Sequence, residues 1–124
     1  MLFRSGLPSI IPLVESENAL ANLTQFTSMA ALEAVFMGVG DLARLKGLAA
    51  DVRDPTMASV LRDAVNVCTQ RGVTVMCSTG RSDTLDEILT SIDLLWHIGI
   101  KVIWVPNPSH IAFKLYQTVM DRIR

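Results

Sequence analysis

The sequence has little of what marks several common classes of protein. It contains only two cysteines, Cys68 and Cys77, which are too few for a disulfide framework and lack the spacing of a zinc site. A net charge of −1 leaves no surplus of basic side chains for nucleic acid. No apolar run approaches the roughly 18 residues that span a bilayer, and residues 1–7 are too short and too mixed for a secretory signal. We therefore expect a cytoplasmic protein with reduced thiols that binds neither nucleic acid nor membrane.

The composition is nevertheless that of one small folded domain. Half of the 124 residues are hydrophobic and 19% are charged, which excludes intrinsic disorder and supplies a core. The sequence shows no linker and no low-complexity segment, so we treat residues 1–124 as a single unit. It also shows no Ser/His/Asp or Cys/His constellation and no phosphate-loop motif, and we assign no catalytic residue.

Four apolar runs of strand length predict a repeated βα architecture. The runs are Ser9–Val14, Leu32–Met37, Val73–Cys77 and Ile100–Val105. They are nearly continuous rather than alternating, which is typical of parallel strands buried on both faces. Because a helical pattern follows each run, the predicted order is (βα)4.

The segment between the second and third of these runs carries clear signals of a helix. Asp54 and Pro55 form a good N-cap and first-turn pair, and Gly72 stands where a C-terminal cap belongs. The helix between them is predicted to bury one apolar face, consisting of Met57, Val60, Leu61, Ala64, Val65 and Cys68.

Two further helices follow. Thr84 and Glu87 predict a capping box that opens a helix ending near Gly99, and the last helix is predicted to start around Ser109. The side chains expected to face inward in the first are Leu85, Ile88, Leu89 and Ile92, and the apolar stripe of the last is Ile111, Leu115, Val119 and Ile123.

Four parallel strands fit two α/β folds. One is a small open sheet with helices on both faces, and the other is half of an eight-stranded barrel, whose usual length is about 250 residues. Composition and periodicity do not separate them. In both folds, ligands bind at the carboxyl ends of the strands.

The longest irregular segment, Ala43–Arg53, predicts a short turn of helix and a surface loop.

Two acids are expected at the carboxyl ends of the strands, each directly after one of two neighbouring predicted strands. Glu15 follows the first strand and Asp41 follows the second, one βα unit later. Two adjacent carboxylates repel each other unless a cation binds between them, and hard oxygen ligands suit magnesium or manganese. The alternative is that each acid lies in the first turn of a helix, where the dipole favours it.

Two glycines precede Asp41. Gly38 and Gly40 allow the backbone to approach a ligand closely, and amides at the start of the following helix can hold a carboxylate. The alternative is an ordinary tight turn. Weaker candidates are Arg81 for an anionic group, His110 beside the site, His97 at a helix end, Trp96 and Trp104 in packing, and Cys77 as a small buried residue.

Three segments together resemble the C-terminal half of the HpcH/HpaI aldolase family, the class II pyruvate aldolases typified by 4-hydroxy-2-oxoheptanedioate aldolase. IIPLVESENALANL resembles that family's strand with a ligand glutamate, AVFMGVGDLARLKG its glycine-rich turn with a ligand aspartate, and DPTMASVLRDAVNVCTQRGV its following helix. The match runs from Pro8 to Gly80 and continues more loosely to the end, whereas residues 1–7 match nothing in the family.

The resemblance implies a fold, a cofactor and a reaction. The fold would be the C-terminal half of a TIM (βα)8 barrel of the phosphoenolpyruvate/pyruvate type, a partial domain. Glu15 and Asp41 would bind a divalent cation (Mg, Mn or Co), and the backbone at Gly38, Gly40 and Asp41 would hold the carboxylate of pyruvate. The reaction would be the cleavage of 4-hydroxy-2-oxo acids to pyruvate and an aldehyde, and its reverse.

The sequence also departs from the family. Val39 replaces the usual proline of the turn, and Ala43 replaces a frequent serine. The family's substrate-polarising arginine and its histidine linked to proton transfer belong to the four absent βα units. We therefore expect low activity unless a homo-oligomer or a complementing half-barrel completes the site.

Two alternatives to this aldolase remain open. One is a citrate-lyase β-type lyase, which the segment DPTMASVLRDAV fits less well than it fits the aldolase. The other is a non-catalytic α/β binding or interaction module. A receiver-like domain is the less suitable example, since Lys101 lies at the start of the last strand rather than at its end.

Overall fold

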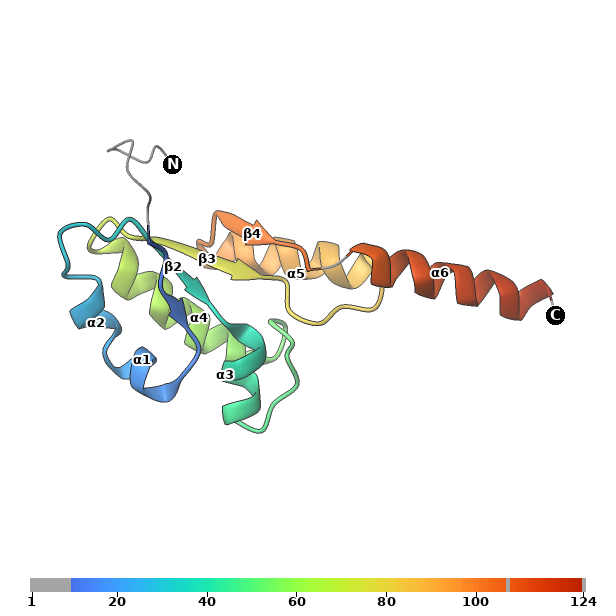
Figure 1. Cartoon of the computed structure of the whole chain (residues 1–124), viewed down its shortest axis with the longest axis horizontal. Helices are drawn as coiled ribbons and strands as arrows, with labels where there is room; N and C mark the ends of the chain where they lie inside the picture. The colour runs from blue at the N-terminus through green and yellow to red at the C-terminus, as the bar shows by residue number, and fades with distance from the viewer. Residues whose placement is uncertain (1–9, 107, 124) are drawn as a thin grey trace.

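The computed structural model describes residues 10–106 and 108–123, and it alternates strands and helices along the chain (Figure 1). The elements are β1 (Leu13–Val14), α1 (Glu17–Ala21), α2 (Leu23–Phe26), β2 (Ala34–Met37), α3 (Val39–Leu45), α4 (Pro55–Thr69), β3 (Thr74–Ser78), α5 (Leu85–Ile98), β4 (Val102–Trp104) and α6 (Pro108–Ile123). The strands form one parallel sheet in the order β1-β2-β3-β4. The predicted α/β fold of four βα units is confirmed.

β1, β2 and β4 are shorter than the predicted apolar runs, whereas β3 has the predicted length and begins one residue later. β1 begins at Leu13, although the amide of Phe36 still donates to the carbonyl of Pro12 at 2.9 Å. Ser9, the predicted first residue of that strand, lies outside the described residues. The predicted irregular segment Ala43–Arg53 contains the end of α3 and then a loop, as expected.

Helices cover only one face of the sheet. On that face the register aligns Val14, Met37 and Cys77, all of them buried. On the opposite face it aligns Leu13, Phe36 and Met76, of which Leu13 is 51% exposed and the other two are half-buried. Burial of the strands on both faces is therefore a wrong prediction for the described chain, and an open sheet with helices on both faces is excluded there.

α4 supplies more residues to the core than any other helix. The Asp54 carboxylate accepts from the amides of Thr56 and Met57 at 2.8 and 3.2 Å, as predicted for the N-cap. The buried residues of this helix are Met57, Ala58, Leu61, Ala64, Val65 and Cys68, whereas the predicted Val60 is only half-buried. The C-terminal cap is Gln70 rather than the predicted Gly72, because the helix ends earlier and Gly72 supplies a φ of 69° in the turn toward β3.

Removing this cap gives a first testable prediction. Asp54→Ala is expected to lower the free energy of unfolding by about 1 kcal/mol, because two helix amides lose their acceptor. Urea denaturation measures the change. The control is Asp63→Ala on the exposed side of the same helix, which removes an acid without removing a cap. Equal losses in the two variants would show that the cap does not stabilise α4.

α5 begins and ends where the sequence predicts. Thr84 Oγ1 accepts from the Glu87 amide at 3.2 Å, the Glu87 carboxylate accepts from the Thr84 amide at 3.2 Å, and Gly99 ends the helix at a φ of 109°. Its buried residues are Ile88, Ser91 and Leu95. Leu85 and Leu89 were predicted to face inward, but they are 61% and 51% exposed. The buried residues are spaced at i, i+3 and i+7 and define the face of the helix toward the sheet, and both leucines lie outside that face. The predicted Ile92 is half-buried.

α6 projects away from the rest of the chain (Figure 1). Much of its apolar stripe is open, with Leu115 66%, Val119 48% and Ile123 71% exposed. Among the described residues, no helix combines the length and the apolar character needed to cross a membrane.

Candidate functional site

The two acid-bearing segments meet at the carboxyl edge of the sheet. Glu15 follows β1 and Gly38 follows β2, and the Gly38 amide donates to the Val14 carbonyl at 2.9 Å. A Cβ added to Gly38 would lie 2.9 Å from Cβ of Glu15, a distance that real Cβ atoms do not adopt. Glycine at position 38 therefore lets the chain of β1 leave the sheet directly beside the turn that carries Asp41.

Glu15 has no role in starting a helix. Ser16 is the N-cap of α1, because its Oγ accepts from the Ala19 amide at 3.1 Å. Glu17 is the acid of the first turn and forms an ion pair with Lys46 at 2.9 Å. Glu15 is exposed and makes no hydrogen bond or ion pair with any described residue, so its carboxylate is available to a ligand.

Asp41 does lie in the first turn of a helix, α3, as the alternative explanation predicts. Its carboxylate is 2.5 Å from the Arg44 guanidinium, and the two side chains are 44% and 78% exposed. An exposed ion pair of this kind contributes little to stability. The Asp41 carboxylate can therefore exchange Arg44 for a stronger ligand at small cost.

Gly40 differs from Gly38 in its surroundings. A Cβ added to Gly40 would meet nothing within 4 Å, and the backbone there does not adopt a positive φ. Neither backbone conformation nor packing in the described chain requires a glycine at position 40. Because glycine has no side chain, the space over the first turn of α3 is open, and helix amides there lack intrahelical acceptors.

The donors at this edge fit a hard cation that keeps several water ligands. Glu15 and Asp41 supply two carboxylates from adjacent strand ends, and Mg²⁺ commonly binds through one or two carboxylates. Within residues 10–106 and 108–123, no group of three or more His, Cys, Asp or Glu side chains could enclose a metal, so a closed structural zinc site is not formed there. The assignment of Glu15 and Asp41 as ligands stays a prediction.

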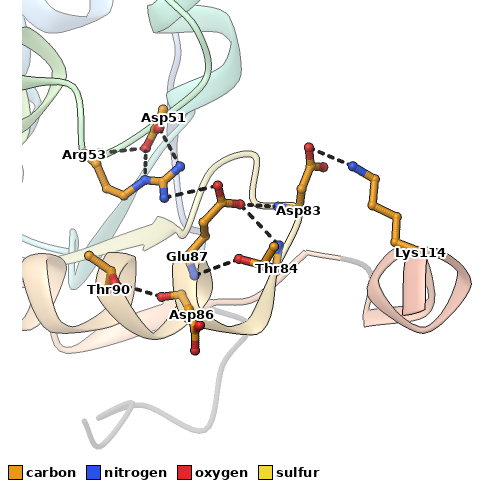
Figure 2. A network of polar contacts seen from close by, with 8 residues as sticks. All are labelled: Asp51, Arg53, Asp83, Thr84, Asp86, Glu87, Thr90 and Lys114. Carbon is orange, nitrogen blue, oxygen red and sulfur yellow. Dashed lines mark hydrogen bonds and ion pairs between the residues drawn. The ribbon is translucent and has the colours of Figure 1, made fainter. Parts of the chain in front are cut away.

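A polar network joins three segments next to this edge (Figure 2). Asp51 accepts from Arg53 at 2.8 and 2.7 Å, and Arg53 lies 3.6 Å from Glu87. Glu87 accepts from the Asp83 amide at 2.7 Å, and Asp83 pairs with Lys114 at 2.8 Å. The loop after α3, the start of α5 and the first turns of α6 are thereby held together.

The network keeps its three acids ionised. Hydrogen bonding to Arg53 lowers the pKa of Asp51, and hydrogen bonds from Lys114 and then His110 lower the pKa of Asp83. The backbone amide of Asp83 lowers the pKa of Glu87.

A pocket of about 240 Å³ opens between the loop after β3 and the start of α6. Its lining residues are Thr79, Gly80, Arg81, Ser82, Ile88, Pro106 and His110. Arg81 and His110 were weak candidates in the sequence, and the structure brings them to the same pocket. Thr79 and Ser82 were missed, although their place directly after the third strand was a usable signal.

The remaining candidates from the sequence are buried or contact other residues of the chain. Burial raises the pKa of Cys77 to about 12, so this thiol is protonated, as expected of a small buried residue. His97 contacts the Asp93 carbonyl at 2.6 Å in the last turn of α5. Trp96 lies under the Lys101 ammonium, and Trp104 packs edge-on against Phe36 with ring centroids 5.9 Å apart.

Solved structures with the same arrangement identify the fold. No protein-family model matches the chain, and no curated protein matches it significantly. An HpcH/HpaI aldolase/citrate lyase family protein from Burkholderia cenocepacia J2315 superposes with a TM-score of 0.73 at 18% identity, over 94% of this chain and 42% of that protein. Macrophomate synthase (TM-score 0.65, 20% identity, 94% and 38% covered) and the citrate synthase SbnG (0.67, 16%, 90% and 43%) are also similar.

At these identities the likeness concerns the fold. The chain spans about 40% of the length of each of these proteins, and within its described residues helices cover one face of the sheet. Both observations fit a barrel-like fold that is present in part. The chain thus has the fold of a little under half of an HpcH/HpaI aldolase/citrate lyase family protein.

Proposed function

We propose that this chain is the metal-binding part of a carbon–carbon lyase that cleaves 4-hydroxy-2-oxo acids to pyruvate and an aldehyde. The observation that carries the proposal is the contact between Glu15 and Gly38, which sets the two acid motifs side by side at the carboxyl edge. Ligands of barrel enzymes bind at that edge, and the structural neighbours include an aldolase/citrate lyase family protein.

In this proposal the residues of the chain bind and orient rather than transfer protons. Glu15 and Asp41 hold a divalent cation, either magnesium, manganese or cobalt. When bound, the cation supplies the positive charge that stabilises the negative charge developing on the 2-oxo oxygen as the carbon–carbon bond breaks. The amides around Gly40 and Asp41 orient the carboxylate of the 2-oxo acid, and the space over Gly40 admits it.

The proposal includes a second polypeptide. The open sheet face carries Leu13, Phe36 and Met76, and β1 and β4 are unpaired edges in the described sheet. Parallel sheets are stable when both faces are covered, and unpaired edges favour association. A homo-oligomer or a complementing half-barrel would cover this face and supply the groups that act on the substrate.

Pyruvate release from 4-hydroxy-2-oxo acids with Mn²⁺ tests the proposal. The chain alone is expected to show little turnover, and turnover should rise when the first four βα units of an HpcH/HpaI aldolase are fused upstream. Glu15→Gln should abolish that rise. Full turnover by the monomeric chain would contradict the need for a second half, and fused activity that is unaffected by Glu15→Gln would contradict the assigned site.

A second candidate, a non-catalytic interaction module, is favoured by the same open face and by the exposed stripe of α6. It predicts association without Mn²⁺ binding, so the metal measurement separates the two functions.

A further inference from the structure

The pocket between β3 and α6 contains two hydroxyl groups without partners. Thr79 is fully buried and Ser82 is half-buried, and both line the pocket. In the described part of the chain, Thr79 Oγ1 and Ser82 Oγ are buried atoms with no hydrogen-bond partner. A buried hydroxyl without a partner is destabilising, and two beside one pocket indicate donors held for a bound group.

One cation at the pocket has no ion pair within the described part of the chain. Arg81 lines it and forms no ion pair with any described residue. The nearby acid is Asp83, which is already paired with Lys114 at 2.8 Å and with His110 Nε2 at 3.3 Å. The charge of Arg81 also acts on Asp83 and helps to lower the pKa of that carboxyl, but its guanidinium forms no ion pair in the described residues. Hydroxyl donors beside a guanidinium match the oxygens of a planar anion.

We infer that this pocket binds the carboxylate group of a small organic acid, with Arg81 as the cation and Thr79 and Ser82 as hydroxyl donors. The volume of about 240 Å³ is below that of most ligand pockets, so it suits one end of a small molecule. That the anion belongs to an organic acid rests on the proposed function, in which the substrates are 2-oxo acids. Free phosphate shares the same chemistry and is the other source of such an anion.

The loop that carries the pocket is fixed before any ligand binds. The Arg81 amide donates to the Ala50 carbonyl at 2.6 Å, and Gly80 forms an isolated bridge with Asp51. The network around Glu87 then holds the start of α5 (Figure 2). A preformed pocket loses little freedom on binding a ligand.

Metal-free titration of the ¹⁵N-labelled chain with succinate, its neutral diamide and inorganic phosphate tests the inference. Succinate is expected to shift the amide signals of Gly80, Arg81 and Ser82, and the diamide is not. Arg81→Gln and Thr79→Val should each weaken succinate binding at least about tenfold, as expected for the loss of a hydrogen bond to a charged group. Arg71→Gln, at an exposed arginine in the turn between α4 and β3 that does not line the pocket, is the control and should bind normally.

Stability gives a second readout, because Thr79→Val removes an unsatisfied hydroxyl without changing volume. Its melting temperature should stay level or rise. A lower melting temperature, the absence of succinate-dependent shifts, or binding of phosphate in preference to succinate would each overturn the inference. Because no metal is present, a failure here leaves the role of Glu15 and Asp41 to be tested separately.

Discussion

Gly80→Ala is expected to be the most destabilising substitution considered for this chain, with a loss of about 3 kcal/mol or more in the free energy of unfolding. Gly80 adopts a φ of 72°, and a Cβ there would lie 2.6 Å from the Ala50 carbonyl oxygen. The positive φ alone costs an L-residue about 1 to 2 kcal/mol. The overlap adds to this cost, since the obstacle is backbone that also accepts the Arg81 amide and cannot move freely.

Gly47→Ala is the matched control for this prediction. Gly47 adopts a φ of 66°, and a Cβ there would meet nothing within 4 Å. It should therefore show the backbone cost alone, about 1 to 2 kcal/mol. Urea unfolding of both variants measures the difference, and losses of the same size would show that the loop after β3 does not pack tightly against Ala50.

Gly38→Ala is expected to damage both the sheet edge and the proposed metal site. The new Cβ would lie 2.9 Å from Cβ of Glu15, and the φ of −81° at Gly38 adds no backbone strain. Overpacking of this kind costs about 1 to 3 kcal/mol. Because Glu15 must move away from the turn that carries Asp41, Mn²⁺ affinity should fall at least about tenfold, which corresponds to about 1.4 kcal/mol.

Gly40→Ala separates the two effects. Its Cβ meets nothing, and alanine is favoured over glycine in a helix by about 1 kcal/mol. The variant should be at least as stable as the natural chain and should bind Mn²⁺ normally, while the added methyl group should weaken pyruvate binding. If Gly38→Ala binds Mn²⁺ as well as Gly40→Ala does, contact with Glu15 is not what shapes the site.

Local signals predicted several helix ends and the alternation of strands and helices. Asp54, Thr84 and Gly99 act on neighbouring residues only, so the helix starts and the end of α5 could be derived from the sequence. The pairing of β1 with β2, the two strands that Glu15 and Asp41 follow, agrees with the predicted neighbouring parallel strands.

Features that depend on distant contacts could not be predicted. The exposure of Leu85 and Leu89 depends on where α5 lies against the sheet. The partly exposed face beside Phe36 could not be predicted, because continuous apolar strands predict two covered faces. The pocket at Thr79 depends on α6 bringing His110 back to the loop after β3, although His110 lies 31 residues after Thr79 in the sequence.

The central claim is that Glu15 and Asp41 together bind a divalent cation, and direct measurement of Mn²⁺ binding by electron paramagnetic resonance tests it. The chain is expected to bind Mn²⁺ at a single site, and Glu15→Gln and Asp41→Asn should each lower the affinity at least about tenfold, because each removes a charged ligand. Asp63→Asn, an exposed acid on α4, should leave binding unchanged. Mn²⁺ binding that is the same in all three variants as in the natural chain would contradict the claim.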